Sequence, residues 1–513
     1  MEKSKTEERN IVNYSLDELT NEIAPTLTRR AALKRFGVGL AGAALACWLL
    51  LPPAVSAGTL GPLLELSRPN AVGTCDDGIA GSGPGTINDA AESFVVVNPV
   101  NPKNIVVAWI QGPFQNIVSA TSFDGGKTWQ QVPMPLTVCS GGPYLGAGDP
   151  WLSFAPNGEL HAIALVANSF DNPNVAVNKS TDGGLHWSAP NLLAPNTDSR
   201  FSQDKPSIKA DSSDPRYVYA VWEQLASGNR RFVDLARTTN NGLSWELPRH
   251  IIDLGNSDEA QDPQIFVMPD GTLVCMFIEV FFHNANGGDQ KEAILATIRS
   301  ADRGQTWSVP ITGPRIPIFQ ATDPDTGTPY VNQNFYPPAI CAMAVDPRTG
   351  NLYVAFEDTH FSGGQYADIA FTMSTDRGSS WSLPIPVNRT PVNIPAANRQ
   401  AFTPAVAVAA DGTIGVTYYD FRFNDSQPGL PTDYWLVQCH PSRRVSPTDP
   451  ANWGEELRLT ARSFDMEKAW APFLAYFMGD YEGLAAVGND FVSVFSDVDA
   501  DNLTSVCFRR VGR

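Results

Sequence analysis

Ser122-Phe-Asp124-Gly-Gly126-Lys-Thr-Trp129 is the first of five copies of one eight-residue pattern in this chain. The other copies occupy residues 180–187 (STDGGLHW), 238–245 (TTNNGLSW), 300–307 (SADRGQTW) and 374–381 (STDRGSSW). Successive copies begin 58, 58, 62 and 74 residues apart. Recurrence at such intervals is typical of a protein built from repeated structural units.

The composition of the pattern predicts a tight turn between two strands. An Asp carboxylate can accept backbone N–H groups within the turn, and Gly adopts backbone conformations that other residues avoid. Asn240 keeps one such acceptor in the third copy. The Trp is expected to pack against a neighbouring sheet. We therefore interpret these residues as structural, not catalytic.

A second repeat, a hairpin of two apolar strands, precedes each of the five turns and recurs twice after the last one. Alternating apolar residues, as in residues 413–419 (TIGVTYY), are typical of half-buried strands. The seven hairpins span residues 93–111, 149–167, 205–224, 262–280, 336–358, 402–422 and 480–497. They predict an all-β fold, a seven-bladed β-propeller of four-stranded blades, with a six-bladed ring as the alternative.

The propeller is expected to occupy residues 93–513, after an N-terminal segment at 58–92. The last hairpin lacks an outer strand. Residues 62–66 are apolar enough to supply it and so to close the ring with both ends of the chain.

Residues 1–57 have the features of an export signal preceded by a disordered leader. Thr28-Arg29-Arg30 and the four residues after it resemble a twin-arginine signal, although Ala32 stands where Phe is usual. An apolar stretch, two prolines and Ala57 follow, which predicts cleavage before Gly58. The protein is then secreted or held at the cell envelope or periplasm; a single membrane anchor is the alternative.

Charge and cysteine content narrow the function classes further. The leader holds seven of the 36 Lys and Arg and six of the 54 Asp and Glu, so the mature chain carries 29 minus 48, or −19. Such acidity argues against nucleic acid and anionic membranes as partners. Cys75 and Cys139 are the expected disulfide, both in Gly-rich sequence, whereas Cys275, Cys341, Cys439 and Cys507 are expected to be buried thiols.

Substrate is expected at the face where the first strand of each hairpin begins and the second ends, because loops converge there on the central funnel. Acidic residues predominate at those positions. The candidates are Asp149 as a catalytic carboxylate, and Asp262 and Asp420 with Arg422 and Arg399 as substrate-binding residues. The alternative is that Asp-Pro pairs simply open each strand. No cofactor is required, although Ca²⁺ could neutralise the acidic channel.

The turns and hairpins resemble the sialidase superfamily, whose bacterial neuraminidase repeat is called the Asp box. This resemblance implies an exo-α-sialidase-like glycoside hydrolase with a tyrosine nucleophile, a glutamate partner and an arginine triad. Tyr481 matches the nucleophile in type and late position, Glu223 or Glu279 its partner, and Arg399 and Arg422 two of the triad. The Phe-Arg-Ile-Pro-like motif of sialidases is missing before the first turn; residues 314–317 (PRIP) follow the fourth.

Three functions are compatible with these features. The first is an exported sialidase-like hydrolase of terminal sugars, acting as a monomer on glycans or glycoconjugates. The second is a non-catalytic propeller that binds glycan or protein, and the third is a polysaccharide lyase with Tyr or His as base. Fold alone does not choose among them.

Overall fold

The computed structural model describes residues 58–75, 78, 86–169, 172–194, 200–226, 230–255, 258–284, 288–329, 340–454, 456–471 and 475–512. The expected export signal lies outside these residues, as does the start of the hairpin expected at 336–358. Within them the fold is all-β, with 3-10 helices as its helical elements and no helix long and apolar enough to cross a membrane.

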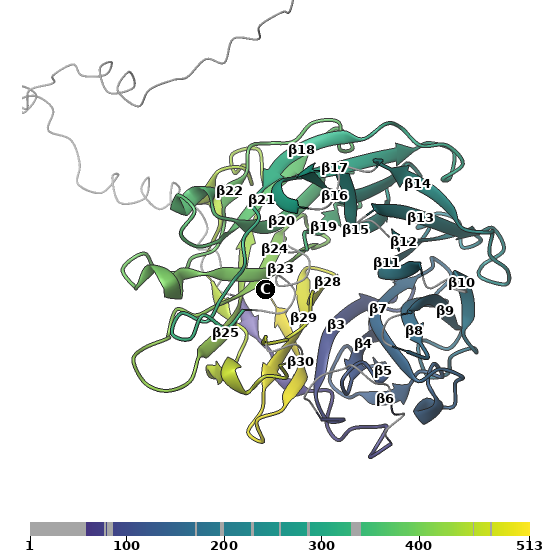
Figure 1. The fold of residues 1–513 in the computed structure, drawn as a ribbon, viewed down its shortest axis with the longest axis horizontal. Helices are drawn as coiled ribbons and strands as arrows, with labels where there is room; N and C mark the ends of the chain where they lie inside the picture. Colours follow the sequence, from purple (N-terminus) through teal and green to yellow (C-terminus); the bar gives the residue numbers. More distant parts are fainter. Residues whose placement is uncertain are drawn as a thin grey trace, which may run out of the picture. The chain divides into compact units, whose positions relative to one another are not determined.

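Seven antiparallel sheets form seven blades, so the six-bladed alternative was wrong. Figure 1 shows them around a central axis, with β3, β7, β11, β15, β19, β23 and β28 innermost. Blades 1 and 2 comprise β3 (Ala90–Val97), β4 (Ile105–Gln111), β5 (Asn116–Ser122) and β6 (Gln130–Pro133), then β7 (Gly146–Phe154), β8 (Leu160–Ala167), β9 (Asn174–Ser180) and β10 (Asn191–Ala194). Blades 3 and 4 comprise β11 (Phe201–Ala210), β12 (Val218–Ala226), β13 (Arg230–Thr238) and β14 (Arg249–Asp253), then β15 (Asp258–Val267), β16 (Leu273–Asn284), β17 (Gly288–Ser300) and β18 (Ile311–Ile316).

Blades 5 and 6 comprise β19 (Ala342–Val345), β20 (Leu352–Asp358), β21 (Asp368–Ser374) and β22 (Ile385–Pro386), then β23 (Ala401–Val408), β24 (Ile414–Asp420), β25 (Pro431–Cys439), β26 (Leu457–Arg458) and β27 (Phe464–Asp465). Blade 7 comprises β28 (Gly483–Val487), β29 (Asp490–Val498) and β30 (Thr504–Gly512), completed by β1 (Thr59–Leu60) and β2 (Leu64–Glu65). The 3-10 helices are η1 (Val138–Ser140), η2 (His360–Ser362), η3 (Ala396–Arg399), η4 (Pro450–Asn452) and η5 (Met466–Lys468).

The ring closes where both ends of the chain meet. β1 and β2 both pair with β30, and this is the stretch expected to supply the outer strand. The predicted disulfide between Cys75 and Cys139 is present and links the N-terminal segment to the connection between blades 1 and 2. The other four cysteines are buried thiols, as predicted.

The five repeated turns have the structural role that their composition predicted. In the first, the Ser122 hydroxyl donates to Asp124 (2.9 Å) and accepts the N–H of Gly126 (2.9 Å), while Asp124 accepts the N–H of Thr128 (2.9 Å). The same hydroxyl-to-carboxylate or hydroxyl-to-amide bond is made in the other four turns. Trp187 of the second turn donates to Ser119 in blade 1 (3.1 Å), so the turn also ties neighbouring blades together.

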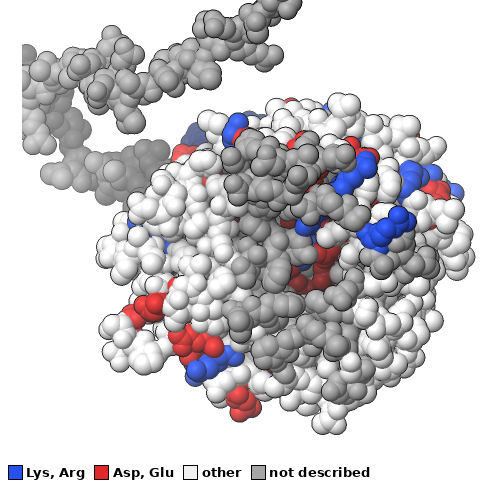
Figure 2. Space-filling model, viewed as in Figure 1, with Lys and Arg blue, Asp and Glu red and all other residues white. Residues whose placement is uncertain are grey.

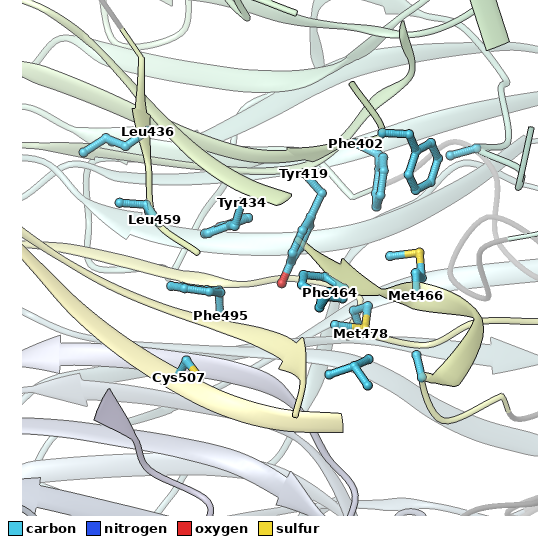
Figure 3. Packing of buried hydrophobic residues seen from close by; sticks show 14 of the residues in the cluster. Phe402, Tyr419, Tyr434, Leu436, Leu459, Phe464, Met466, Met478, Phe495 and Cys507 are labelled. Atoms are coloured by element: carbon cyan, nitrogen blue, oxygen red, sulfur yellow. The ribbon is translucent and has the colours of Figure 1, made fainter. Parts of the chain in front are cut away.

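The core is divided among the interfaces between blades. Seven hydrophobic clusters each join two neighbouring blades, including blades 7 and 1. Figure 3 shows the aromatic cluster between blades 6 and 7, where Tyr419 lies between Tyr434 (ring centroids 4.3 Å apart) and Phe464 (6.3 Å). Because every blade buries both of its faces, the inner strands are held rigidly around the axis.

Candidate functional site

A β-bulge interrupts the inner strand of five blades at the same place. Each bulge contains one residue in the left-handed backbone region, which is rare for residues other than glycine. These residues are Glu92 (φ 56°), Asp149 (52°), Lys205 (46°), Asp262 (52°) and Thr403 (49°). A proline follows each of the last four. Bulges redirect side chains out of the regular alternation, so these residues can converge on the axis instead of a neighbouring blade.

Four of the bulge residues meet Asp480, which directly precedes blade 7, in what we call the axial cluster: Glu92, Asp149, Lys205, Asp262 and Asp480. The Lys205 ammonium group is paired with Asp480 and lies 3.8 Å from Asp149 Oδ2. The side chains of Lys205, Asp149 and Asp480 are 8–9% exposed, so they are nearly buried yet reach solvent. Figure 2 shows Asp and Glu side chains within the hollow at the centre of the visible face.

Burial raises the pKa values of three carboxyl groups in the axial cluster. Burial raises the pKa of Asp149 to about 7 against the opposing effects of Lys205 and the nearby Glu92 side chain. The pKa of Glu92 is well above its usual range because of burial and the nearby charges of Asp149 and Asp480. Burial and the nearby charge of Glu223 also raise the pKa of Asp262 well above its usual range. Carboxyl groups this close cannot all ionise at neutral pH, so the cluster retains protons.

Several carboxyl oxygens of the axial cluster accept no hydrogen bond from the described residues. They are Glu92 Oε2, Asp149 Oδ2 and Asp262 Oδ2, all buried. Buried acceptors are rarely left without a donor in native proteins. The cluster is therefore suited to a ligand that donates several hydrogen bonds.

Three aromatic side chains from blades 1, 2 and 7 pack together next to the axial cluster. Phe94 and Trp151 each lie two residues after a bulge residue, and their rings stack with centroids 4.5 Å apart. Tyr481 packs edge-on against Trp151 (5.7 Å) and donates its hydroxyl to the Pro150 carbonyl (3.2 Å). Burial and the carboxylates of Glu92 and Asp149 hold the pKa of Tyr481 well above its usual range. We call these three residues the aromatic floor.

The structure does not bring the expected glutamate partners to Tyr481. Glu223 accepts the N–H of Asp262 (2.5 Å) and a hydrogen bond from Arg231 (2.7 Å), so it fixes the bulge of the next blade. Glu357 likewise accepts the N–H of Thr403 (3.0 Å) and so fixes the bulge of blade 6. No described contact joins Glu223 or Glu279 to the Tyr481 hydroxyl.

The two expected clamp arginines also have partners elsewhere in the fold. Arg422 pairs with Asp420 (2.6 Å) and Glu456 (2.6 Å) and lies 3.7 Å above the Trp435 ring. Arg399 lies 4.3 Å from the ring centroid of Tyr366 in the connection between η2 and β21. Among the described residues, neither arginine contacts Tyr481 or the axial cluster.

Of the residues predicted from the sequence, the axial cluster therefore contains Asp149 and Asp262. Glu92, Lys205 and Asp480 complete it and were not selected as site residues. A signal existed for Lys205, because Lys205-Pro206 repeats the Asp-Pro pairs at 149–150 and 262–263. In the described part of the chain, no group of three His, Cys, Asp or Glu side chains is arranged to hold a metal ion.

No known protein-family model matches the chain, and no curated protein matches it. Several solved structures are similar to it. The Hadza microbial sialidase Hz136 is 14% identical with a TM-score of 0.45, over 80% of this chain and 73% of that one. An α-L-arabinanase of Penicillium chrysogenum, complexed with arabinobiose, is 14% identical with a TM-score of 0.45, over 70% of this chain and 94% of that one.

A sialidase of Trypanosoma rangeli, in complex with sialic acid, is 15% identical with a TM-score of 0.42 over 75% of this chain. The chain spans about half of that protein's length, 55%. Likeness at this level does not decide an activity, which has to come from the chemistry of the axial cluster.

Proposed function

We propose that the protein is a glycoside hydrolase and that the axial cluster is its active site. The observation that carries this proposal is the pairing of two carboxyl groups in different environments. Burial raises the pKa of Asp149 to about 7 although Lys205 lies 3.8 Å away, whereas Asp480 pairs directly with the Lys205 ammonium group. Glycosidic cleavage needs a protonated acid beside an ionised carboxylate, and environments that differ in this way assign those roles.

In this proposal Asp149 protonates the departing oxygen of the glycosidic bond. Asp480, held by Lys205, activates water or stabilises the positive charge that develops on the sugar ring. Glu92 lies close enough to Asp149 for the charge of each to affect the other, so it supplies the second carboxyl group of a pair that shares protons. The buried acceptor oxygens of Glu92 and Asp262 are suited to the hydroxyl groups of a sugar.

The charge of the axial cluster favours a neutral sugar. It contains four carboxyl groups and one ammonium group, and an anionic sugar such as sialic acid would be repelled unless arginines compensated. Specificity for terminal sialosides, as the sequence resemblance implied, would require Arg399, Arg422 or another arginine to approach the bound sugar. A panel of substrates decides between these specificities.

The test is hydrolysis of 4-nitrophenyl glycosides, including an α-sialoside, an α-L-arabinofuranoside and neutral pyranosides, by the mature protein. For a cleaved substrate, Asp149→Asn is expected to lower kcat/KM by about 10²–10⁴-fold. The loss should be much smaller with a 2,4-dinitrophenyl leaving group, which needs no protonation. Asp501→Asn, at an exposed loop position, is the matched control.

The Tyr481→Phe variant distinguishes catalysis by the carboxyl groups of the axial cluster from catalysis by a tyrosine nucleophile. Its hydroxyl donates to a backbone carbonyl, so we expect the variant to keep most of its activity, whereas a tyrosine nucleophile would make it inactive. If Asp149→Asn is as active as the parent, the axial cluster is not the catalytic site. Tight binding of an oligosaccharide without turnover would instead identify a glycan-binding propeller.

We also propose export through the twin-arginine pathway, on the basis of residues 28–34 and the apolar segment that follows. Arg29→Lys with Arg30→Lys should leave the precursor uncleaved inside the cell, which immunoblotting of cell fractions would detect. Unchanged processing of this variant would show that another route is used.

A further inference from the structure

A cavity lies along the central axis, and the three residues of the aromatic floor line one part of it. Its volume is about 580 Å³, within the range of small-molecule sites. Its walls are mainly apolar side chains of the inner strands, such as Phe266, Met343 and Val406. It extends to Pro99, Pro156, Pro269 and Pro347, in the turns that follow the inner strands. It therefore approaches the face opposite the axial cluster.

Lys209 is the residue of this cavity that the fold does not explain. It stands four residues after its bulge residue, where the other bulged strands have Val96, Ser153, Phe266 and Ala407, and all five residues line the cavity. Because side chains alternate along a strand, positions two and four residues after the bulge share one side. Lys209 is therefore a charged residue at a position where the other four bulged strands have apolar or small side chains.

Lys209 makes no hydrogen bond or ion pair with the described residues. Two other charged residues line the cavity, and both are bonded elsewhere: Asp480 to Lys205, and Glu482 to Ser93 (2.6 Å) and Tyr419 (2.7 Å). Burial lowers the pKa of Lys209, and no carboxylate among the described residues opposes this effect. A cation in such surroundings costs free energy unless an anion compensates it.

We propose that this channel binds a small amphipathic anion, an apolar body with one carboxylate or sulfonate, whose charged group pairs with Lys209. The apolar part points toward the aromatic floor, which is about 7 Å from the level of Lys209 at the rise of a β-strand. One end of this site reaches Asp480 of the axial cluster, but the proposed ion pair is with Lys209, so the proposal does not depend on the hydrolase activity.

The test uses two fluorescent probes that differ in charge, 1-anilinonaphthalene-8-sulfonate and the neutral N-phenyl-1-naphthylamine. Lys209→Met should bind the anionic probe at least about tenfold more weakly, because a desolvated charge pair is lost, and should bind the neutral probe as the parent does. Lys209→Arg should retain the anionic probe. Lys127→Met, at an exposed position of the first repeated turn, is the matched control.

A second variant locates the binding. Ala407→Phe fills the channel at the level of Lys209 and should abolish binding of both probes, while octanoate should displace the anionic probe from the parent. Equal affinity of Lys209→Met and the parent for the anionic probe, or equal losses for both probes, would overturn the proposal. Absence of anionic-probe binding to the parent would do the same.

Discussion

At the scale of single residues, Lys205 offsets the free-energy cost of burying the carboxyl groups of the axial cluster. Its ammonium group pairs with Asp480 and lies 3.8 Å from Asp149 in a nearly buried site. Removing one partner of a buried ion pair typically costs about 3–5 kcal/mol. We expect Lys205→Met to lower the free energy of unfolding by that amount in urea at pH 7, and Lys205→Arg to lower it less. Unchanged stability of Lys205→Met would show that water alone accommodates these carboxyl groups.

The Lys205 ammonium group also affects whether the acidic channel can bind Ca²⁺. Lys205 already supplies a positive charge beside Asp149 and Asp480, and a divalent ion would have to displace it. We therefore expect the melting temperature and the hydrolysis rate to be unaffected by EDTA or by millimolar Ca²⁺. A melting temperature that rises with Ca²⁺ concentration and falls again with EDTA would contradict this expectation.

Asp149 should make the protein less stable as pH rises. Burial raises its pKa from 3.8 to about 7, so between these values the folded state binds more protons than the unfolded state. The free energy of unfolding then decreases with increasing pH across that interval, by up to about 4 kcal/mol for this group alone. Asp149→Asn lacks the titration and should gain stability over the parent between pH 4 and 8, as measured by urea unfolding. Parallel pH profiles for the two proteins would refute this prediction.

Catalysis by Asp149 should also decrease as pH rises. The acid must be protonated to act, so kcat/KM should fall as pH rises through about 7, the raised pKa of this group. The alkaline limb of the profile should disappear with the 2,4-dinitrophenyl leaving group. A limb that persists with that substrate would assign the titration to another residue.

At the scale of elements, each repeated turn is both a local motif and a contact between blades. In the first turn Gly126 has φ 92°, and an added Cβ would lie 2.5 Å from Phe508 in β30. Gly141 has φ 86° but nothing within 4 Å. Gly141→Ala should therefore cost about 1–2 kcal/mol for the backbone alone, and Gly126→Ala about 2–4 kcal/mol, because it adds the clash. Chemical denaturation measures both, and equal losses would mean that the turn can move away from β30.

These turns could be predicted from the sequence because their interactions are local. Ser122, Asp124 and Gly126 make their hydrogen bonds within one eight-residue segment, so composition alone reports the geometry. The count of seven blades followed from the repeats for the same reason. The disulfide followed from the few cysteines outside strand-like sequence.

The axial cluster was predicted less well because β-bulges, and not the regular alternation of side chains along a strand, direct its side chains toward the axis. Regular alternation would direct Asp204 and Lys205 to opposite faces of the sheet, and the proline after Lys205 is the one local feature that distinguishes them. Glu92 was missed because β3 begins at Ala90, three residues before the expected hairpin at 93. Arg422 and Tyr481 have the residue types of a catalytic site, but their partners come from Glu456 and Pro150, which no periodicity connects to them.

At the scale of the whole molecule, the ring depends on residues far apart in the sequence. Glu482, beside β28, accepts hydrogen bonds from Ser93 of blade 1 (2.6 Å), Tyr419 of blade 6 (2.7 Å) and the N–H of Ser496 in blade 7 (2.9 Å). At the rim, the backbone of Gly61 and Leu66 bonds to Arg510 (2.8 Å) and Val506 (2.7 Å). Closure therefore has an inner and an outer part, and only the outer part can be removed without disturbing the axial cluster.

Deleting residues 58–66 tests that outer part, with a chain that begins at Gly58 as the control. The deletion removes the buried Leu66 side chain and the backbone bonds to β30, a loss of about 3–5 kcal/mol. It also leaves β30 as an exposed edge strand that can pair with another molecule. We expect a lower melting temperature and concentration-dependent association in size-exclusion chromatography, with glycosidase activity per folded molecule unchanged. A truncated protein as stable and as monodisperse as the control would mean that Glu482 and the cluster between blades 7 and 1 suffice to close the ring.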